Sequence, residues 1–138
     1  MGSASPFLEI NLEKVRYNAA QVVTRCHEQG IEVLGVTKGV SADPRIVTAM
    51  VEGGVDGLAD ARMENIIELR EIGSNLPITL LRIPRLSNVR NVVRFADVSV
   101  NSEITVVKAL AKEAQEIKRI HPIILMVDVG DLREGILE

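Results

Sequence analysis

Several residues that can bind an anion or form a covalent bond come directly after short apolar segments of this chain. Lys38 follows residues 32–37, and polar or charged residues follow four later segments. These later residues are Asp60, Arg62, Arg82, Asn101, Ser102, Asp128, Asp131 and Arg133. If the segments are parallel strands, their carboxyl ends meet at one edge, where α/β folds place their sites. A lysine and two or three arginines at one edge predict a pocket for a small anion. The alternative is that strand ends simply become polar on reaching solvent.

Lys38 has the most specific chemistry of this set. It ends the segment Val-Leu-Gly-Val-Thr and is followed by Gly39, so we expect apolar neighbours along its stem. Partial burial lowers the pKa of a lysine amine and makes its neutral form available for bonding to a carbonyl group. The competing interpretation is an ordinary solvated lysine at a strand end.

Alternating strands and helices are expected to position these residues. Apolar runs predict strands at 32–37, 56–59, 78–81, 98–100 and 123–127, the last of them buried on both faces. Alternation over residues 7–10 predicts one more short strand. Periodicity and capping predict helices from residue 12, over 44–52, 61–71, 88–95 and 103–119, with N-caps at Asn11, Asp43 and Asn101 or Ser102.

The order of these elements predicts an α/β fold with a parallel sheet and right-handed crossovers. Five to six strands fit either an open doubly wound sheet or an arc of a (β/α)8 barrel of the TIM type. A closed barrel typically needs about 250 residues. The chain has 138 residues, so a barrel built from it would be incomplete.

Composition excludes several classes of function. A net charge of −3 and an aromatic content of 2% disfavour binding of nucleic acid. The single cysteine, Cys26, cannot form an internal disulfide, and no apolar stretch approaches the roughly 18 residues of a membrane span. Residues 1–6 lack a secretory leader pattern, so we expect a cytoplasmic protein. His27 and His121 lack metal-ligand spacing, and no metal site is predicted.

Three motifs resemble those of the fold-type III pyridoxal-phosphate enzymes, the alanine racemase-like barrel family. They are residues 8–12 with Tyr17-Asn18, Gly35-Val36-Thr37-Lys38, and residues 127–136. Residues 58–65 and 80–84 are most similar to the branch that contains ornithine racemases and related amino-acid racemases. The resemblance covers nearly the whole chain.

This resemblance implies that residues 1–138 are the N-terminal part of a pyridoxal-phosphate-binding barrel, without the rest of the barrel or a C-terminal β-domain. Lys38 would hold the cofactor covalently and act as one acid/base at the substrate Cα. Arg133 would lie near the phenolic oxygen of the cofactor. By the same resemblance, Asp60, Arg62, Arg82 and Asn101 would occupy matching positions at the carboxyl ends of the strands, with no separate role assigned to each, and Asp60, Arg82 and Asn101 are expected to bind the cofactor.

Two departures from the family bear on activity. Residues 39–43 contain no tyrosine, whereas alanine racemases carry one a few residues after the lysine, so alanine is disfavoured as the substrate. Met126 stands where many members have a modified lysine. In the family, the second acid/base and the phosphate-binding loops come later in the chain, so these residues alone are predicted to be inactive.

Two other functions remain open. One is a pyridoxal-phosphate homeostasis or carrier protein of the same fold, and the other is a non-catalytic α/β module that binds partners through open sheet edges. For the racemase, the expected partners are a small amino-acid substrate, with no nucleic acid or membrane. We also expect a homo-oligomer or association with the missing part of the barrel.

Overall fold

The computed structural model describes residues 7–137. The leader prediction concerns residues 1–6, which lie outside the described residues. The elements are α1 (Leu12–His27), β1 (Leu34–Val36), η1 (Lys38–Val40), α2 (Pro44–Glu52), β2 (Gly57–Asp60), α3 (Met63–Glu71), β3 (Ile78–Leu80), η2 (Leu86–Asn88), α4 (Val89–Phe95), β4 (Val98–Asn101), α5 (Ile104–Glu116) and β5 (Ile123–Leu125). None of these helices is both long and apolar enough to cross a membrane.

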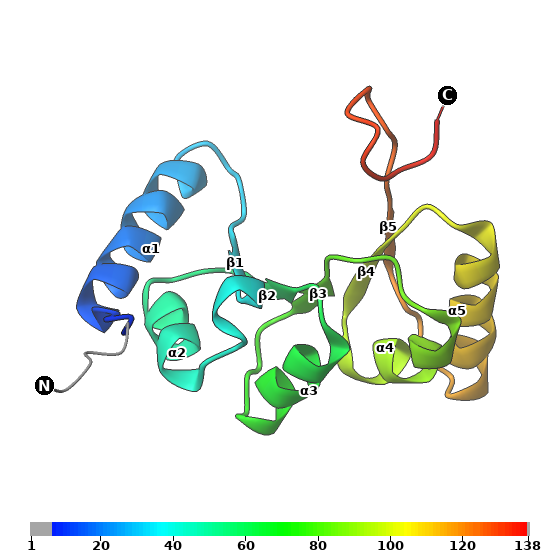
Figure 1. Cartoon of the computed structure of the whole chain (residues 1–138), viewed down its shortest axis with the longest axis horizontal. Coiled ribbons are helices and arrows are strands. Elements are labelled where there is room, and N and C mark those ends of the chain that lie inside the picture. The colour runs from blue at the N-terminus through cyan, green and yellow to red at the C-terminus, as the bar shows by residue number, and fades with distance from the viewer. Residues whose placement is uncertain (1–6, 138) are drawn as a thin grey trace, which may run out of the picture.

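The five strands form one parallel sheet in the order β1-β2-β3-β4-β5. A doubly wound sheet reverses its strand order at a switch point. Because each strand here pairs with the next one along the chain, the sheet is an arc of a barrel. Helices α2, α3 and α4 lie together on one side of the sheet, and the sheet does not close (Figure 1). The predicted incomplete barrel is confirmed.

The core lies between the sheet and these helices. Leu58 and Ile78, on neighbouring strands, are completely buried, as are Ile66 of α3 and Val92 of α4. Burying each such side chain contributes roughly 1.5–3 kcal/mol to folding. Gly57 lets β2 approach the residue before β3, because a Cβ there would lie 2.9 Å from the Pro77 carbonyl oxygen, a backbone atom.

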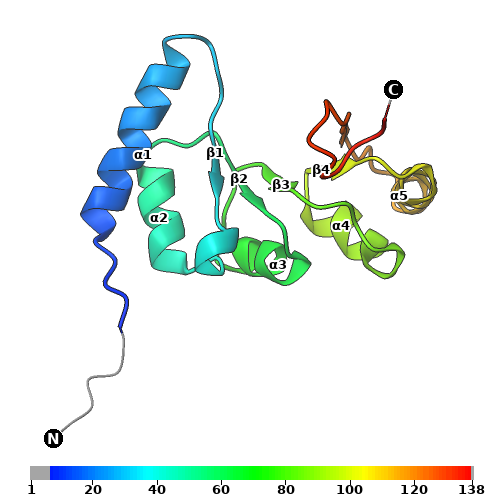
Figure 2. The same cartoon turned by 45° about the horizontal axis from the view of Figure 1, so that its top comes forward.

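Two local capping signals are confirmed. The Asn11 side chain accepts a hydrogen bond from the Lys14 amide at 2.9 Å and starts α1. The Asp43 carboxyl caps α2, in which Pro44 is the first residue. Helix α1 then packs beside α2, as both views show (Figures 1 and 2).

The strand predicted at residues 7–10 is wrong. The structure has no strand there, and Phe7 and Leu8 are 87% and 84% exposed. Alternating apolar residues make a strand only where a neighbouring strand completes the hydrogen-bond ladder. Among the described residues, no strand pairs with this segment.

Two predictions near the end of the chain are also wrong. The apolar run of β5 is exposed, with Ile124 and Leu125 at 49% and 55%, because β5 pairs only with β4 and no helix follows it among the described residues. Asn101 and Ser102 do not cap α5, whose N-cap residue is Glu103. Asn101 is instead the last residue of β4, and its side chain bonds back to Ser99.

Candidate functional site

Lys38 lies just after the carboxyl end of β1, as the first residue of the short 3-10 helix η1. Among the described residues the Lys38 side chain is exposed, so the prediction of partial burial is wrong. No side-chain hydrogen bond or ion pair engages its ammonium group within residues 7–137. The Lys38 side chain is therefore unpaired and open to solvent at the carboxyl end of the strands, as the alternative of an ordinary solvated lysine also expects.

Thr37, the residue before the lysine, ties this position to the neighbouring strand. Thr37 is completely buried. Its amide donates to the Ala59 carbonyl at 2.9 Å, and its hydroxyl donates to Asp60 Oδ2 at 2.7 Å. The Val40 amide donates to the Thr37 carbonyl at 3.0 Å and closes the turn. The backbone that carries Lys38 is thus held on both sides.

Asp60 is the centre of this hydrogen-bond network. Its carboxyl group is completely buried on the helix-covered side of the sheet. It accepts hydrogen bonds from the Thr37 hydroxyl, from the Arg62 amide at 2.9 Å and from Asn65 Nδ2 at 3.0 Å. Asp60 therefore links the end of β1, the end of β2 and the first turn of α3.

The segment after the lysine has a constrained backbone. Ser41 and Ala42 have φ values of 49° and 53°, in the left-handed region that residues other than glycine rarely occupy. Such conformations cost roughly 1–3 kcal/mol each and cluster at functional sites. The segment ends at Asp43, where the Arg45 guanidinium beside the carboxyl lowers its pKa to about 2.

Within the described residues, the other predicted site residues form no hydrogen bond or ion pair with one another. Asn101 is completely buried, and its Nδ2 donates to the carbonyl and hydroxyl oxygens of Ser99, both at 3.0 Å. Its Oδ1 is buried without a partner in the described chain. Arg133 is exposed in the loop after β5, and Asp128 shapes that loop by accepting the Gly130 amide at 2.8 Å.

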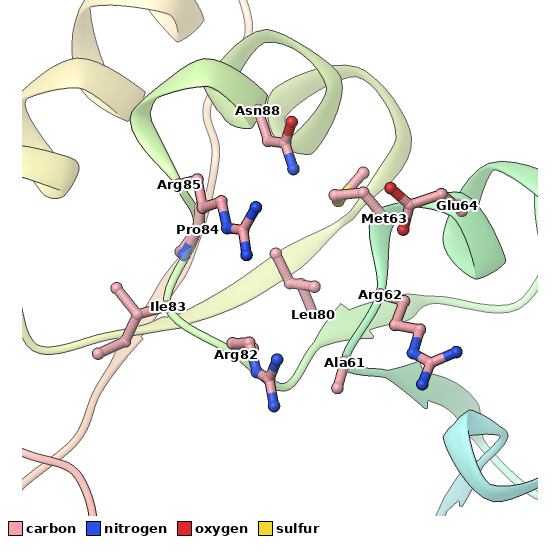
Figure 3. Close-up of a pocket in the computed structure, with 10 residues that line it drawn as sticks. All are labelled: Ala61, Arg62, Met63, Glu64, Leu80, Arg82, Ile83, Pro84, Arg85 and Asn88. Carbon is pink, nitrogen blue, oxygen red and sulfur yellow. The ribbon is translucent and has the colours of Figure 1, made fainter.

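Arg82 lines a separate pocket of about 250 Å³ between the start of α3 and the connection from β3 to η2 (Figure 3). Lys38 does not line it. The structure therefore links Lys38 with Asp60, through Thr37. Within the described residues, no hydrogen bond or ion pair joins Lys38 to Arg82, Asn101 or Arg133.

Sequence reasoning missed the residues that support the site. Thr37 and Asn65 form the network around Asp60, and only the polar threonine inside an apolar run could have indicated this. Asp97 was also missed. Asp97 lies just before β4, at the amino ends of the strands and therefore opposite to Lys38. Its carboxylate accepts a hydrogen bond from the Ile78 amide at 2.8 Å and pairs with Arg70. That edge of a parallel barrel serves stability.

A family model described as "Alanine racemase, N-terminal domain" matches residues 10–138. The chain is 39% identical to the ornithine racemase of Acetoanaerobium sticklandii, over 96% of this chain and 37% of that protein. It is 37% identical to the lysine racemase of Thermotoga maritima, over 95% of this chain and 37% of that protein. The chain thus spans 37% of the length of these two curated relatives.

Solved structures of the same fold agree with this. An alanine racemase of Clostridium difficile 630 superposes with a TM-score of 0.79 at 20% identity, covering 91% of this chain and 33% of that one. PipY of Synechococcus elongatus PCC7942, solved with PLP bound, superposes with a TM-score of 0.70 at 18% identity, covering 87% and 58%. At these identities the likeness establishes the fold.

The parallel barrel arc agrees with the fold of these structures, and the family model covers residues 10–138. The chain belongs to the alanine racemase N-terminal domain family.

Proposed function

We propose that this chain is the cofactor-holding part of a pyridoxal-phosphate-dependent amino-acid racemase, and that Lys38 holds the cofactor. One observation carries the proposal. Lys38 presents an exposed, unpaired amine on a backbone that Thr37 and Asp60 hold in place. Family membership, the two racemase relatives and the PLP recorded in PipY support the choice of cofactor.

The side chains at this edge of the sheet fit such a cofactor chemically. An aldehyde that also carries a phosphate group requires a primary amine for attachment and positive charge nearby. Lys38 supplies the amine, and Arg82 and Arg133 follow other strands of the same sheet. When bound, pyridoxal phosphate supplies a ring that spreads negative charge away from the substrate Cα.

The roles of this chain's residues follow from that placement. Lys38 holds the cofactor and moves a proton at one face of Cα, while Thr37 and Asp60 keep its backbone in position. Arg133 would stabilise charge near the cofactor ring. Contacts of Asp60, Arg82 and Asn101 with the cofactor stay predictions. Racemisation needs a proton donor at each face of Cα. We assign the second donor to residues outside this chain, and we therefore expect residues 1–138 alone to be inactive.

The proposed substrate is an amino acid other than alanine. The absence of tyrosine from residues 39–43 disfavours alanine. The names of the ornithine and lysine racemases favour a basic amino acid. We also propose association with the rest of a barrel or with a second copy. Strands β1 and β5 are each paired on one side only within the described residues, and Val36 and Leu125 on them are exposed.

Reductive labelling tests the role of Lys38. The protein is incubated with pyridoxal phosphate, reduced with borohydride and digested, and the modified peptide is identified by mass spectrometry. We expect the cofactor mass on the peptide that contains Lys38, and its loss in Lys38→Ala. The matched control is Lys108→Ala, which removes an exposed lysine from α5. Labelling of another lysine in the unsubstituted protein would refute the assignment.

The second candidate is a protein that carries the cofactor without catalysis, and the observation that favours it is the PLP recorded in PipY, a protein of the same fold. Both candidates require labelling at Lys38. They differ in proton exchange at Cα, which is measured with ornithine or lysine in deuterated water. Exchange supports the racemase, and labelling without exchange in the whole protein supports the carrier.

A further inference from the structure

Two polar side chains of β4 lie on the helix-covered face of the sheet. Ser99 and Asn101 are both completely buried. In the register of the sheet Ser99 lies beside Leu80, and Leu80 beside Asp60, so all three face the helices. An apolar residue such as Leu80 satisfies packing at this level, whereas a buried polar group is costly unless it is hydrogen-bonded. The hydroxyl of Ser99 therefore needs a specific partner.

That partner is His121, in the connection between α5 and β5. The Ser99 hydroxyl and His121 Nε2 are joined by a hydrogen bond of 2.9 Å. Asn101 Nδ2 donates to the hydroxyl oxygen and to the carbonyl oxygen of Ser99, both at 3.0 Å. These three side chains, which we call the β4 cluster, join β4 to the segment that leads into β5.

Strand β5 has little else that selects its register against β4. It consists of Ile123–Leu125 and pairs only with β4 among the described residues. Alternation of apolar and polar residues normally selects a register, because a shift of one residue exchanges the two faces of a strand. All three residues of β5 are apolar and exposed, so this signal is missing. The bond between Ser99 and His121 selects one register, since a shift of one residue moves His121 by about 3.3 Å.

The register of β5 sets the position of the loop that carries Arg133. Just after β5, the Met126 amide donates to the Asn101 carbonyl at 2.9 Å. The Ile136 amide donates to the Met126 carbonyl, and the Asp128 amide donates to the Ile136 carbonyl, both at 2.9 Å. The loop is thus closed at its base, and its base is attached to β4.

We propose that Ser99 and His121 are positioning residues, which fix the register of β5 and thereby hold the loop of Arg133 in place. Their effect on the cofactor rests on the proposed function, in which Arg133 stabilises charge near the cofactor ring. The arrangement parallels the support that Asp60 gives to Lys38. In both places a buried polar side chain on the helix-covered face joins its own strand to a neighbouring one.

Hydrogen exchange of the protein and two variants, followed by mass spectrometry, tests whether the β4 cluster holds the loop. Ser99→Ala and His121→Ala each remove the bond from one side. We expect the peptide covering residues 126–136 to exchange about fivefold faster or more in both, because loss of one hydrogen bond raises an opening equilibrium by roughly that factor. The peptide covering residues 63–71 of α3 should be unchanged.

The matched control is Ser74→Ala. It also removes a buried hydroxyl, but this one has no hydrogen-bond partner in the described chain. We expect exchange of the loop in the control to stay within about twofold of the unsubstituted protein. Unchanged loop exchange in Ser99→Ala, or an equal rise in α3 or in the control, would overturn the proposal.

Cofactor affinity separates a positioning role from a general loss of stability. Ser99→Ala should weaken binding of pyridoxal phosphate about twofold or more, but less than Arg133→Ala does. It should have no further effect when Arg133→Ala is already present, because residues that act through one contact are not additive. Equal weakening with and without Arg133 contradicts the proposal. If the unsubstituted protein takes no cofactor at Lys38, the proposed function fails, and the exchange measurement still decides whether the β4 cluster holds the loop.

Discussion

Replacing Asp60 by alanine should destabilise the fold, because Asn65 Nδ2 and the Arg62 amide lose their acceptor and the Thr37 hydroxyl keeps only the Ala59 carbonyl, at 3.4 Å. The Thr37 hydroxyl and Asn65 Nδ2 are buried, with residue exposures of 0% and 7%. The third donor, the Arg62 amide, is partly buried and can reach water. A buried donor left without a partner costs about 1–3 kcal/mol. Only the Asn65 amide is then buried without any acceptor, while the Thr37 hydroxyl keeps a longer bond, so we expect Asp60→Ala to lower the free energy of unfolding by about 2 kcal/mol.

Two milder variants test the origin of this loss. Thr37→Val removes one donor and keeps the shape of the side chain, so we expect a loss of about 1 kcal/mol. Asp60→Asn keeps one acceptor oxygen but places an amide nitrogen among donors, so its effect should lie between the other two. Urea denaturation followed by circular dichroism measures all three, with unchanged slopes indicating that only stability has changed.

A small effect of Asp60→Ala would refute this reasoning. If the free energy of unfolding fell by less than about 1 kcal/mol, the donors would be finding other partners. The network would then not hold the backbone at Lys38. The same variants should also slow reductive labelling of Lys38 in protein that remains folded, because the amine loses its fixed position.

Three further predictions concern stability and pH. Asp97→Ala should lower the free energy of unfolding by about 2–4 kcal/mol in urea denaturation, because it leaves the half-buried Arg70 without its carboxylate. The pKa of Asp43 is lowered from 3.8 to about 2, so its stabilising effect is present above pH 3.8 and is lost as the pH falls toward 2. Asp43→Asn should therefore reduce the difference in urea midpoint between these two pH values. Burial lowers the pKa of His121 below 6.5, so stability should fall as the pH drops below 6.5, and His121→Gln should flatten that profile.

Local patterns in the sequence were sufficient to predict most of the elements. The caps at Asn11 and Asp43 act within one turn of chain, and the apolar runs of β1 to β5 lie where predicted. The strand expected at residues 7–10 failed because a strand depends on a partner that local sequence does not contain. The prediction that β5 is buried on both faces was wrong for a related reason, because burial depends on neighbouring segments that local sequence does not reveal.

The sequence alone determined that a lysine ends the first strand of an alternating α/β chain, because both features depend on neighbouring residues. Only the tertiary structure decided what surrounds it. Successive side chains of a strand point to opposite faces of the sheet, so pairing and packing set which face Asp60 takes. Packing placed the Asp60 carboxylate on the helix-covered face of the sheet, where it is buried and accepts a hydrogen bond from the Thr37 hydroxyl. It also brought Arg62 and Arg82 from separate loops into one pocket, since contacts between distant segments form only when the chain packs.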